Sequence, residues 1–223
     1  MRAMILAAGR GARLRPLTDT RPKPLVEVAG QTLIERHVQA LVAAGFDRIV
    51  INLGWLGEQI VETLGNGADF GAQIAYSREP PGALETAGGI VHALPLLGNA
   101  PFAVISADIL TDFDFARLRR PLRAAAHLVL VDNPGHHPRG DFALAGPRVV
   151  AESHRPRLTF SGIAVFDPAL FAGLKPGPRP LRPVLMRAIA RNQVSGERFG
   201  GRWADIGTPG RLHRAQQSWS ESS

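Results

Sequence analysis

Apolar side chains in the first half of the chain follow two alternating spacings. Residues 3–8 form an unbroken apolar run, typical of a strand buried on both faces of a sheet. Within residues 32–44 the apolar positions have helical spacing, and Gly45 is placed to end that helix. Further strands are expected at residues 48–53, 73–77, 102–106 and 127–131, and further helices at residues 56–64, 86–97 and 114–124. This alternation predicts an α/β fold in which helices flank a mostly parallel sheet.

The pattern changes after Asp132. Residues 133–140 are rich in Pro and Gly, and the runs 142–150 and 157–166 suit antiparallel pairing. We therefore expect one domain, residues 1–223, with a small antiparallel insertion over about residues 133–166 that serves as a lid. After this insertion, a helix is expected at residues 181–192, a strand-like run at 197–205 and a closing helix at 208–219.

Composition and charge narrow the classes of function. The 223 residues, 45% of them hydrophobic, suffice for a full core. The net charge of +7 comes from scattered basic residues, and the cluster Arg117, Arg119, Arg120 and Arg123 is expected to be a solvated helix face. Because no compact basic stripe occurs, no nucleic-acid partner is expected. The absence of cysteine excludes disulfides and thiolate metal sites. No apolar run approaches the ~20 residues of a membrane span, so we expect a cytoplasmic protein without a membrane partner.

The loop after the first expected strand carries candidate phosphate ligands. Gly9 and Gly11 allow main-chain N–H groups to approach a ligand closely. On their own they would also fit an ordinary turn. Arg13 adds a planar guanidinium, and Lys23 adds a compact ammonium between two prolines. Together these groups predict a cradle for a triphosphate.

Two aspartates are candidate metal ligands. Asp108 follows the expected buried strand 102–106, and Asp205 precedes a helix start. If the fold brings them together, their carboxylates suit Mg²⁺, which is held by few carboxylates together with waters and phosphate oxygens. His136 and His137 are adjacent in a loop, where their side chains would diverge, so we expect a solvated turn there rather than a metal pair.

These motifs together resemble the sugar-1-phosphate nucleotidyltransferases over nearly the whole chain. The resemblance rests on residues 6–25 (LAAGRGARLRPLTDTRPKPL), 28–34 (VAGQTLI), 84–89 (LETAGG) and 203–208 (WADIGT). It implies a Rossmann-like domain of the nucleotide-diphospho-sugar transferase type, with an antiparallel insertion over the sugar. A Rossmann dehydrogenase is not favoured, because the opening lacks Gly-x-Gly-x-x-Gly.

The resemblance also implies roles for individual residues. Arg13 and Lys23 would be catalytic and, like the surrounding loop, would bind the nucleotide. The implied nucleotide-binding residues are Ala7, Ala8, Gly9, Gly11, Ala12, Arg13, Lys23, Glu85 and Gly88. The implied sugar-binding residues are Ser106, Asp141, Ser161 and Gly162, and the implied Mg²⁺ ligands are Asp108 and Asp205.

The expected reactants are UTP and a sugar-1-phosphate. The short chain and the segments 127–134 and 158–163 resemble the subgroup that transfers UMP to N-acetylmuramate-1-phosphate in cell-wall recycling. Transfer of UMP, TMP, GMP or CMP to another sugar-1-phosphate or to phosphocholine stays an alternative, as does a non-catalytic nucleotide-binding subunit. A monomer and a homodimer are both open.

The chain departs from the family pattern at two places. Ala107 stands where relatives usually have Gly before the metal aspartate, and Ser106 stands where they often have Asn. Many relatives also carry a Glu-Lys-Pro run whose lysine meets the sugar phosphate. Residues 151–156 contain no lysine here, so Arg155 or Arg157 is the candidate for that role.

Overall fold

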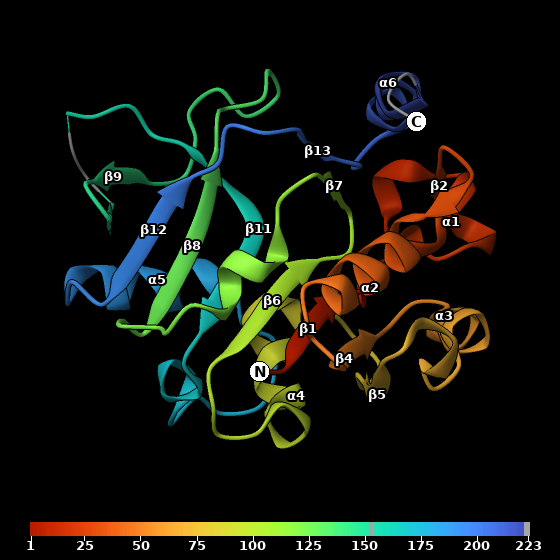
Figure 1. Ribbon diagram of the computed structural model, residues 1–223, viewed down its shortest axis with the longest axis horizontal. Helices are drawn as coiled ribbons and strands as arrows, with labels where there is room; N and C mark the ends of the chain where they lie inside the picture. Colours follow the sequence, from red (N-terminus) through yellow and green to blue (C-terminus); the bar gives the residue numbers. More distant parts are fainter. Residues whose placement is uncertain (152–153, 221–223) are drawn as a thin grey trace.

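A nine-stranded mixed sheet forms the centre of the computed structural model, which describes residues 1–151 and 154–220 (Figure 1). Its strand order is β5-β4-β1-β6-β11-β8-β12-β10-β9. These strands are β1 (Ala3–Leu6), β4 (Arg48–Leu53), β5 (Gln73–Arg78), β6 (Phe102–Ser106), β8 (Ala126–Val131), β9 (Ala143–Ala145), β10 (Arg148–Val150), β11 (Thr159–Phe166) and β12 (Val194–Arg198). Four of the eight neighbouring pairs are parallel, and the four that involve β10 or β11 are antiparallel, so seven of the nine strands run in the same direction. The expected mostly parallel α/β sheet is confirmed.

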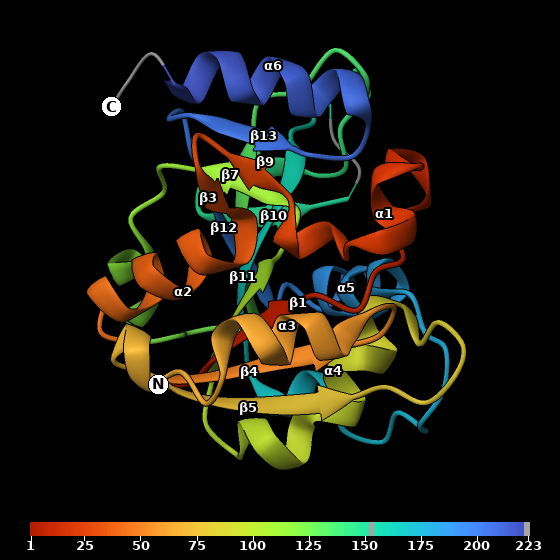
Figure 2. The ribbon, with the colours of Figure 1, turned by 90° about the vertical axis from the view of Figure 1, so that its right-hand side faces the viewer.

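Helices cover both faces of this sheet (Figures 1 and 2). The helices are α1 (Leu17–Thr20), α2 (Leu33–Ala43), α3 (Gly57–Leu64), α4 (Glu85–Leu97), α5 (Leu181–Ala190) and α6 (Pro209–Ser220). Strand β1 shows why both faces need cover, because Ala3 and Ile5 pack with residues of α2 and α3, while Met4 packs with residues of α4 and α5. An unbroken apolar run therefore becomes a central strand.

The sheet has a topological switch point beside β1. Strand β4 pairs with one edge of β1 and β6 with the other, both in parallel. The connection after β1 leads to β4, toward the β5 edge of the sheet, whereas the connection after β6 leads to β8, toward the β9 edge. In open α/β sheets such a point leaves a crevice at the carboxyl ends of the strands.

Two small sheets and α6 form a separate layer over this end of the molecule. The pairs are β2 (Glu27–Val28) with β3 (Gln31–Thr32), and β7 (Ile109–Thr111) with β13 (Trp203–Asp205). Buried Leu110, Ile206 and Ala215 belong to their shared apolar cluster. Figure 2 shows α6 lying above β13. The C-terminal quarter of the chain is thereby held beside the loop that follows β6.

Both runs expected to suit antiparallel pairing form antiparallel pairs, mainly with partners other than each other. Residues 143–150 fold on themselves as the β9–β10 hairpin, which turns at Gly146 and Pro147, and β10 pairs with β12. Strand β11 instead lies between β6 and β8, and a single bridge joins Phe142 to Leu158. The physical reason is that residues 163–166 are buried on both faces, which requires a central position rather than a lid.

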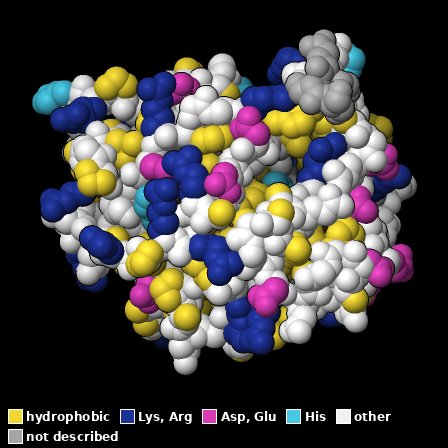
Figure 3. Space-filling model, in the orientation of Figure 1, with side chains coloured by type: hydrophobic (Ala, Val, Ile, Leu, Met, Phe, Trp, Pro, Cys, Tyr) yellow, Lys and Arg dark blue, Asp and Glu magenta, His cyan; other side chains and the backbone are white. Residues whose placement is uncertain are grey.

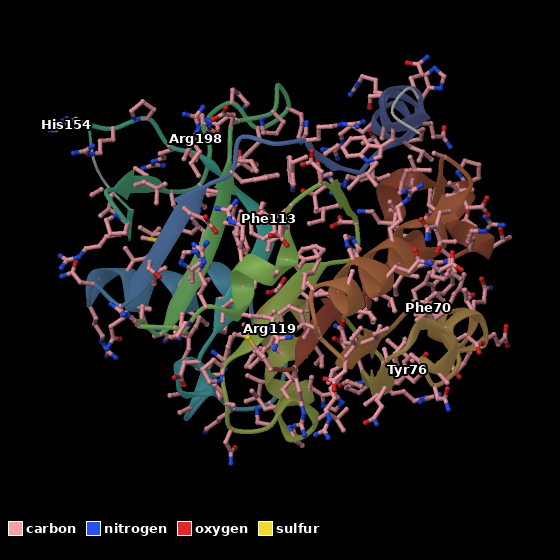
Figure 4. The ribbon with its side chains drawn as sticks, in the orientation of Figure 1. Phe70, Tyr76, Phe113, Arg119, His154 and Arg198 are labelled. Atoms are coloured by element: carbon pink, nitrogen blue, oxygen red, sulfur yellow. The ribbon has the colours of Figure 1, made fainter. Side chains whose placement is uncertain are left out.

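The helix expected at residues 114–124 is also wrong. Only a short 3-10 helix, η4 (Phe115–Arg119), forms, and Asp114 caps it by accepting from the Ala116 N–H at 3.0 Å. Pro121 lacks an N–H and disfavours helical angles at the preceding residue, so the helix ends there. Its arginines are not a wholly solvated face, because Arg117 pairs with Glu197 and Arg119 donates to the Gly45 carbonyl (Figure 4).

The strand-like run 197–205 divides into β12 and β13, which belong to different sheets. No helix in the described part of the chain is long and apolar enough to cross a membrane. On the face shown in Figure 3, basic side chains are interspersed with acidic and apolar ones.

Candidate functional site

A cavity of about 950 Å³ opens at the carboxyl ends of β1, β4, β5 and β6. This is the switch point of the sheet, where the fold leaves room for a ligand. The cavity is lined by residues 6–13, 79–86 and 106–108 and by Lys23, Pro24, Asn52, Gly54, Trp55 and Gly207. The lining includes most of the expected nucleotide-binding residues: Ala7, Ala8, Gly9, Gly11, Ala12, Arg13, Lys23 and Glu85.

The loop after β1 is held in shape by its neighbours. Gly11 has φ of 64°, a left-handed angle that glycine adopts without strain, and its carbonyl accepts a 2.8 Å hydrogen bond from the buried Thr18 hydroxyl. Gly54 lies so close to the Ala8 carbonyl that a β-carbon at position 54 would collide with it. The loop is therefore fixed before a ligand arrives, and its backbone faces the cavity.

Asn52 and Glu79 extend this support, and our sequence reasoning missed both. The buried Asn52 side chain accepts from the Ala7 N–H at 2.7 Å and donates to Glu79 Oε1 at 2.6 Å. Both residues line the cavity. The available signal was an amide within the otherwise apolar strand 49–53, because a buried polar side chain needs hydrogen-bond partners.

The expected cations lie in the same cavity as Asp108. The Lys23 ammonium, on a residue only 8% exposed, forms an ion pair with the Asp108 carboxylate. Arg13 also lines the cavity, and one of its terminal nitrogens lies 3.4 Å from the position that a β-carbon of Gly207 would take. Arg10 stacks over the Trp55 ring with its guanidinium carbon 4.8 Å from the ring centre. Positive charge therefore surrounds the phosphate-sized part of the cavity.

The backbone of Asp205, the second expected metal ligand, lies close to Asp108, but its carboxylate points to Arg211 and His136 instead of into the large cavity. The Ile206 N–H donates to the Asp108 carbonyl at 2.8 Å, so the two acidic segments are adjacent. The Asp205 carboxylate accepts from Arg211 at 2.6 Å and lies 3.0 Å from His136 Nε2. The structure thus unites Arg13, Lys23 and Asp108 in one cavity, while Asp205 lines a second hollow beside it.

The two carboxylates fit Mg²⁺ by the chemistry of their donors. Asp108 is about one-third exposed toward the cavity and already attracts a cation, the Lys23 ammonium. Within the described residues, no group of three or more His, Cys, Asp or Glu side chains forms a closed metal cage. Magnesium commonly uses one or two carboxylates and takes its other ligands from phosphates and water. The Asp108 carboxylate at the cavity therefore suits this ion, and Asp205 would join it on exchanging Arg211 for the metal.

His136 and His137 diverge, as expected, but they are not simply solvated. His136 pairs with Asp205, and His137 Nε2 lies 3.2 Å from Asp141 Oδ1. The expected turn forms at residues 135–136 and both imidazoles are about 40% exposed, but each also contacts a carboxylate: Asp141 lies four residues along the chain from His137, and Asp205 belongs to a distant segment.

Among the four expected sugar-binding residues, Ser106 lines the cavity and the other three lie outside it. Gly162 packs on Ser106, whose hydroxyl lies 2.6 Å from the position that a β-carbon would take. The Ser161 hydroxyl donates to the Val129 carbonyl at 2.7 Å, and Asp141 accepts from the Phe160 N–H at 2.9 Å. Ser161 and Asp141 thus shape the irregular part of β11 in this structure.

Glu85 and Gly88 also differ in position. Glu85 lines the cavity at the start of α4, where its φ is 57°. Gly88 lies outside the cavity and against the connector 177–179, because a β-carbon there would collide with the Gly177 carbonyl. The Gly88 N–H donates to the Arg179 carbonyl at 3.2 Å. The small size of Gly88 therefore serves helix packing.

Buried His37 supports the segment that follows Asp108. Its Nε2 lies 3.0 Å from the Ile109 carbonyl oxygen, and burial lowers the pKa of His37 from 6.5 to about 4. The imidazole is therefore neutral near pH 7, and its Nε2–H donates to that carbonyl. The hydrogen bond ties α2 to Ile109, which follows Asp108 directly and is the first residue of β7. Strand β7 in turn pairs with β13, which ends at Asp205.

Comparisons with known proteins agree with this geometry. A family model described as nucleotidyl transferase matches residues 2–144. The chain is 51% identical to the N-acetylmuramate alpha-1-phosphate uridylyltransferase of Neisseria meningitidis, over 97% of each chain. It is 34% identical to the protein of the same name from Caulobacter vibrioides, over 93% of this chain and 92% of that one.

A similar fold occurs in a crystal structure described as a glucose-1-phosphate thymidylyltransferase from Bacillus anthracis in complex with sucrose. The TM-score is 0.89 at 23% identity, and the match covers 100% of this chain and 96% of that one. At that identity the likeness shows the fold alone. From the family model, the two close relatives and the fold together, it follows that this chain belongs to the nucleotidyl transferase family.

Proposed function

We propose that this chain transfers UMP from UTP to N-acetylmuramate-1-phosphate, giving UDP-N-acetylmuramate and pyrophosphate. The observation that carries the proposal is the shared cavity of Arg13, Lys23 and Asp108 at the switch point of the sheet. The choice of nucleotide and acceptor is supported by the relative that is 51% identical and carries this activity in its name.

The chemistry asks the protein to align two anions. Two unit charges 4 Å apart repel by about 4 kcal/mol at an effective dielectric of 20, and several charges meet here. An oxygen of the sugar phosphate attacks the α-phosphorus of UTP, and the bond from that phosphorus to the β-phosphate oxygen breaks. No covalent nucleophile is needed, because the attacking phosphate is already ionised near pH 7.

The residues of the cavity divide this work. Backbone N–H groups of residues 7–12 and the Arg13 guanidinium hold the triphosphate, and Arg13 stabilises the charge that develops on the leaving pyrophosphate. Lys23 supports the α-phosphate. Asp108 and Asp205 would hold Mg²⁺, which supplies further charge neutralisation to the phosphates when it is bound.

The far end of the cavity favours a base that has an imide N–H. Glu79 contributes a carboxylate there, and one of its oxygens already accepts from Asn52. A carboxylate accepts from the N3–H of uracil or thymine, whereas cytosine and adenine present a lone pair at the corresponding edge. Glu85 lies on the same part of the lining. This acceptor-rich end supports UTP over CTP and ATP.

Ser106 is the expected sugar residue that faces the cavity, and Gly162 keeps the space behind it open. We propose that Asp141 and Ser161 act on the sugar by holding the 158–162 segment in place. All of these groups come from one chain. Because UTP is a cytoplasmic metabolite, we propose a cytoplasmic location.

A substrate panel tests the proposal. Pyrophosphate release would be measured for UTP, TTP, GTP and CTP, each against N-acetylmuramate-1-phosphate, N-acetylglucosamine-1-phosphate, glucose-1-phosphate, mannose-1-phosphate and phosphocholine. We expect the highest kcat/KM for UTP with N-acetylmuramate-1-phosphate. A higher value for another pair would replace the proposed substrates. Nucleotide binding without pyrophosphate release from any pair would identify a non-catalytic subunit instead.

A further inference from the structure

A second hollow of about 520 Å³ adjoins the cavity and carries an excess of positive side chains. It lies between the loop that joins β8 to β9, strand β13 and helix α6 (Figures 1 and 2). We call it the Asp205 hollow. Its lining consists of residues 134–136 and 203–205 and of Arg211, Arg214, Ala215, Gln217 and Ser218.

The charges of the Asp205 hollow are not balanced. Two guanidiniums, those of Arg211 and Arg214, face one carboxylate, that of Asp205. Arg211 forms an ion pair with that carboxylate. Within the described part of the chain, Arg214 makes no ion pair. When Asp205 binds a metal ion, its negative charge is shared with that ion. The two guanidiniums then favour an additional anion.

The buried Arg211 side chain gives independent evidence that a ligand is missing from the hollow. Its side chain is only 10% exposed, and its Nε is buried without a hydrogen-bond partner in the described structure. Buried polar atoms are normally satisfied, so an orphan donor indicates a missing group. Because Arg211 also reaches the backbone at Gly207, which lines the large cavity, that group would lie next to the reaction site.

The arginines that the sequence offered for the sugar phosphate do not line the Asp205 hollow. Neither Arg155 nor Arg157 lines either space, and Figure 4 shows His154, the neighbour of Arg155, beyond the β9–β10 hairpin. Glu152 and Ser153 lie outside the described residues. The positive charge beside Asp205 therefore comes from α6, with His136 completing the rim.

The proposed acceptor has a second acidic group that matches this charge. N-acetylmuramate-1-phosphate differs from N-acetylglucosamine-1-phosphate by a lactyl ether, whose carboxylate stands a few bonds from the sugar ring. Trp203 lines the hollow, and its Nε1–H donates to the carbonyl of Ser161, an expected sugar-binding residue, at 2.9 Å, so the hollow adjoins the segment where the sugar is expected. A neutral hydroxyl at the same position would gain no charge-assisted hydrogen bond.

Resting on the proposed function, we propose that the Asp205 hollow is the subsite for the carboxylate of the acceptor sugar. Arg214 and Arg211 donate to that carboxylate, and the subsite makes the enzyme select acidic sugar-1-phosphates over neutral ones.

The test compares two acceptors in an Arg214→Gln variant. The readout is the ratio of kcat/KM for N-acetylmuramate-1-phosphate to kcat/KM for N-acetylglucosamine-1-phosphate, with UTP saturating. Hydrogen bonds to charged groups and the tenfold change per 1.4 kcal/mol lead us to expect that this ratio falls about tenfold. Arg214→Lys keeps the charge and restores most of the ratio, whereas Arg214→Glu lowers it further. Calorimetric binding of the two acceptors with Mg²⁺ and without UTP provides a second readout that does not depend on turnover.

Arg187→Gln is the matched control, because it removes an exposed arginine from helix α5 and leaves the ratio unchanged. If Arg214→Gln and Arg214→Glu both keep the original ratio while the unsubstituted chain uses N-acetylmuramate-1-phosphate, the subsite is overturned and the proposed function stands. If the unsubstituted chain uses neither acceptor with UTP, the proposed function and the subsite both fall.

Discussion

The large cavity and the Asp205 hollow differ in how their polar groups are held. In the large cavity, residues 7–13 follow one another along the chain, and buried Thr18 and Asn52 fix their backbone. In the Asp205 hollow, the loop around His136 meets the distant segment 203–218, and ion pairs of Asp205 with His136 and Arg211 hold them together. A backbone cradle keeps its shape without a ligand, whereas a cluster of ion pairs changes partners when a new charge enters. If the proposed function holds, the nucleotide side is preformed, and we expect the acceptor side to be the part that changes when its ligands bind.

Asp108→Asn tests the point where the two regions meet and is expected to have the largest effect. Loss of this carboxylate removes a proposed Mg²⁺ ligand and the partner of Lys23. Turnover should fall roughly 10³-fold or more, as for loss of strong transition-state stabilisation. A Mg²⁺ titration of pyrophosphate release measures it. Asp19→Asn, at an exposed surface pair with Arg15, should stay within about twofold. Equal Mg²⁺ responses in both variants would contradict the metal role.

The buried His37, which anchors β7 between the large cavity and the Asp205 hollow, is expected to make the free energy of unfolding depend on pH. Because burial lowers its pKa from 6.5 to about 4, the unfolded chain binds a proton in this range that the folded protein refuses. The free energy of unfolding should therefore fall as pH drops from about 6.5 to 4, by about 3 kcal/mol in total. Urea unfolding at several pH values measures this loss. His37→Gln lacks the titration, so its curve should fall less steeply. Parallel curves for the two proteins would disprove the assignment.

Arg13→Ala separates the preformed cradle from the ion-pair region. Arg13 lines the large cavity, and its loss should lower kcat by about two powers of ten because a preorganised charge contact to the leaving group disappears. Steady-state kinetics with saturating substrates provide the measurement. Arg15→Ala removes a nearby exposed arginine that pairs with Asp19 at 2.9 Å, and kcat should then change by less than about twofold. Similar losses in both variants would mean that only overall charge matters.

Asp141→Ala is expected to have the smallest effect and to reach only the acceptor side. Its carboxylate holds the Phe160 N–H at 2.9 Å and lies near His137 and Arg182. Loss of these contacts should raise KM for the sugar phosphate about tenfold, which corresponds to 1.4 kcal/mol, and leave KM for UTP unchanged. Asp132→Asn, at the exposed pair with Arg198, serves as the control. Equal shifts of both KM values would show that the two regions are not independent.

The sequence-based expectations were accurate where a feature depends on residues close together in the chain, and inaccurate where it depends on how distant segments pack. Strands at residues 48–53 and 102–106 have the expected bounds, because an apolar run between polar turns is a local signal. The nucleotide loop was equally accessible, since its residues are neighbours in the chain. The pairing of β11 was not, because its apolar residues fit several partners and only competition for the sheet centre decides among them. Pro121 shows that one local feature can also overrule helical spacing.

The amino-acid sequence by itself determined the alternation of strands and helices, the phosphate-binding loop and the family, because each depends on residues close together in the chain. Only the tertiary structure decided that Asp108 pairs with Lys23, that Asp205 turns to Arg211 and His136, and that Gly88 serves packing rather than the cavity. The physical reason is that a charged side chain takes the nearest available counter-charge. Which charge is nearest depends on how distant segments pack.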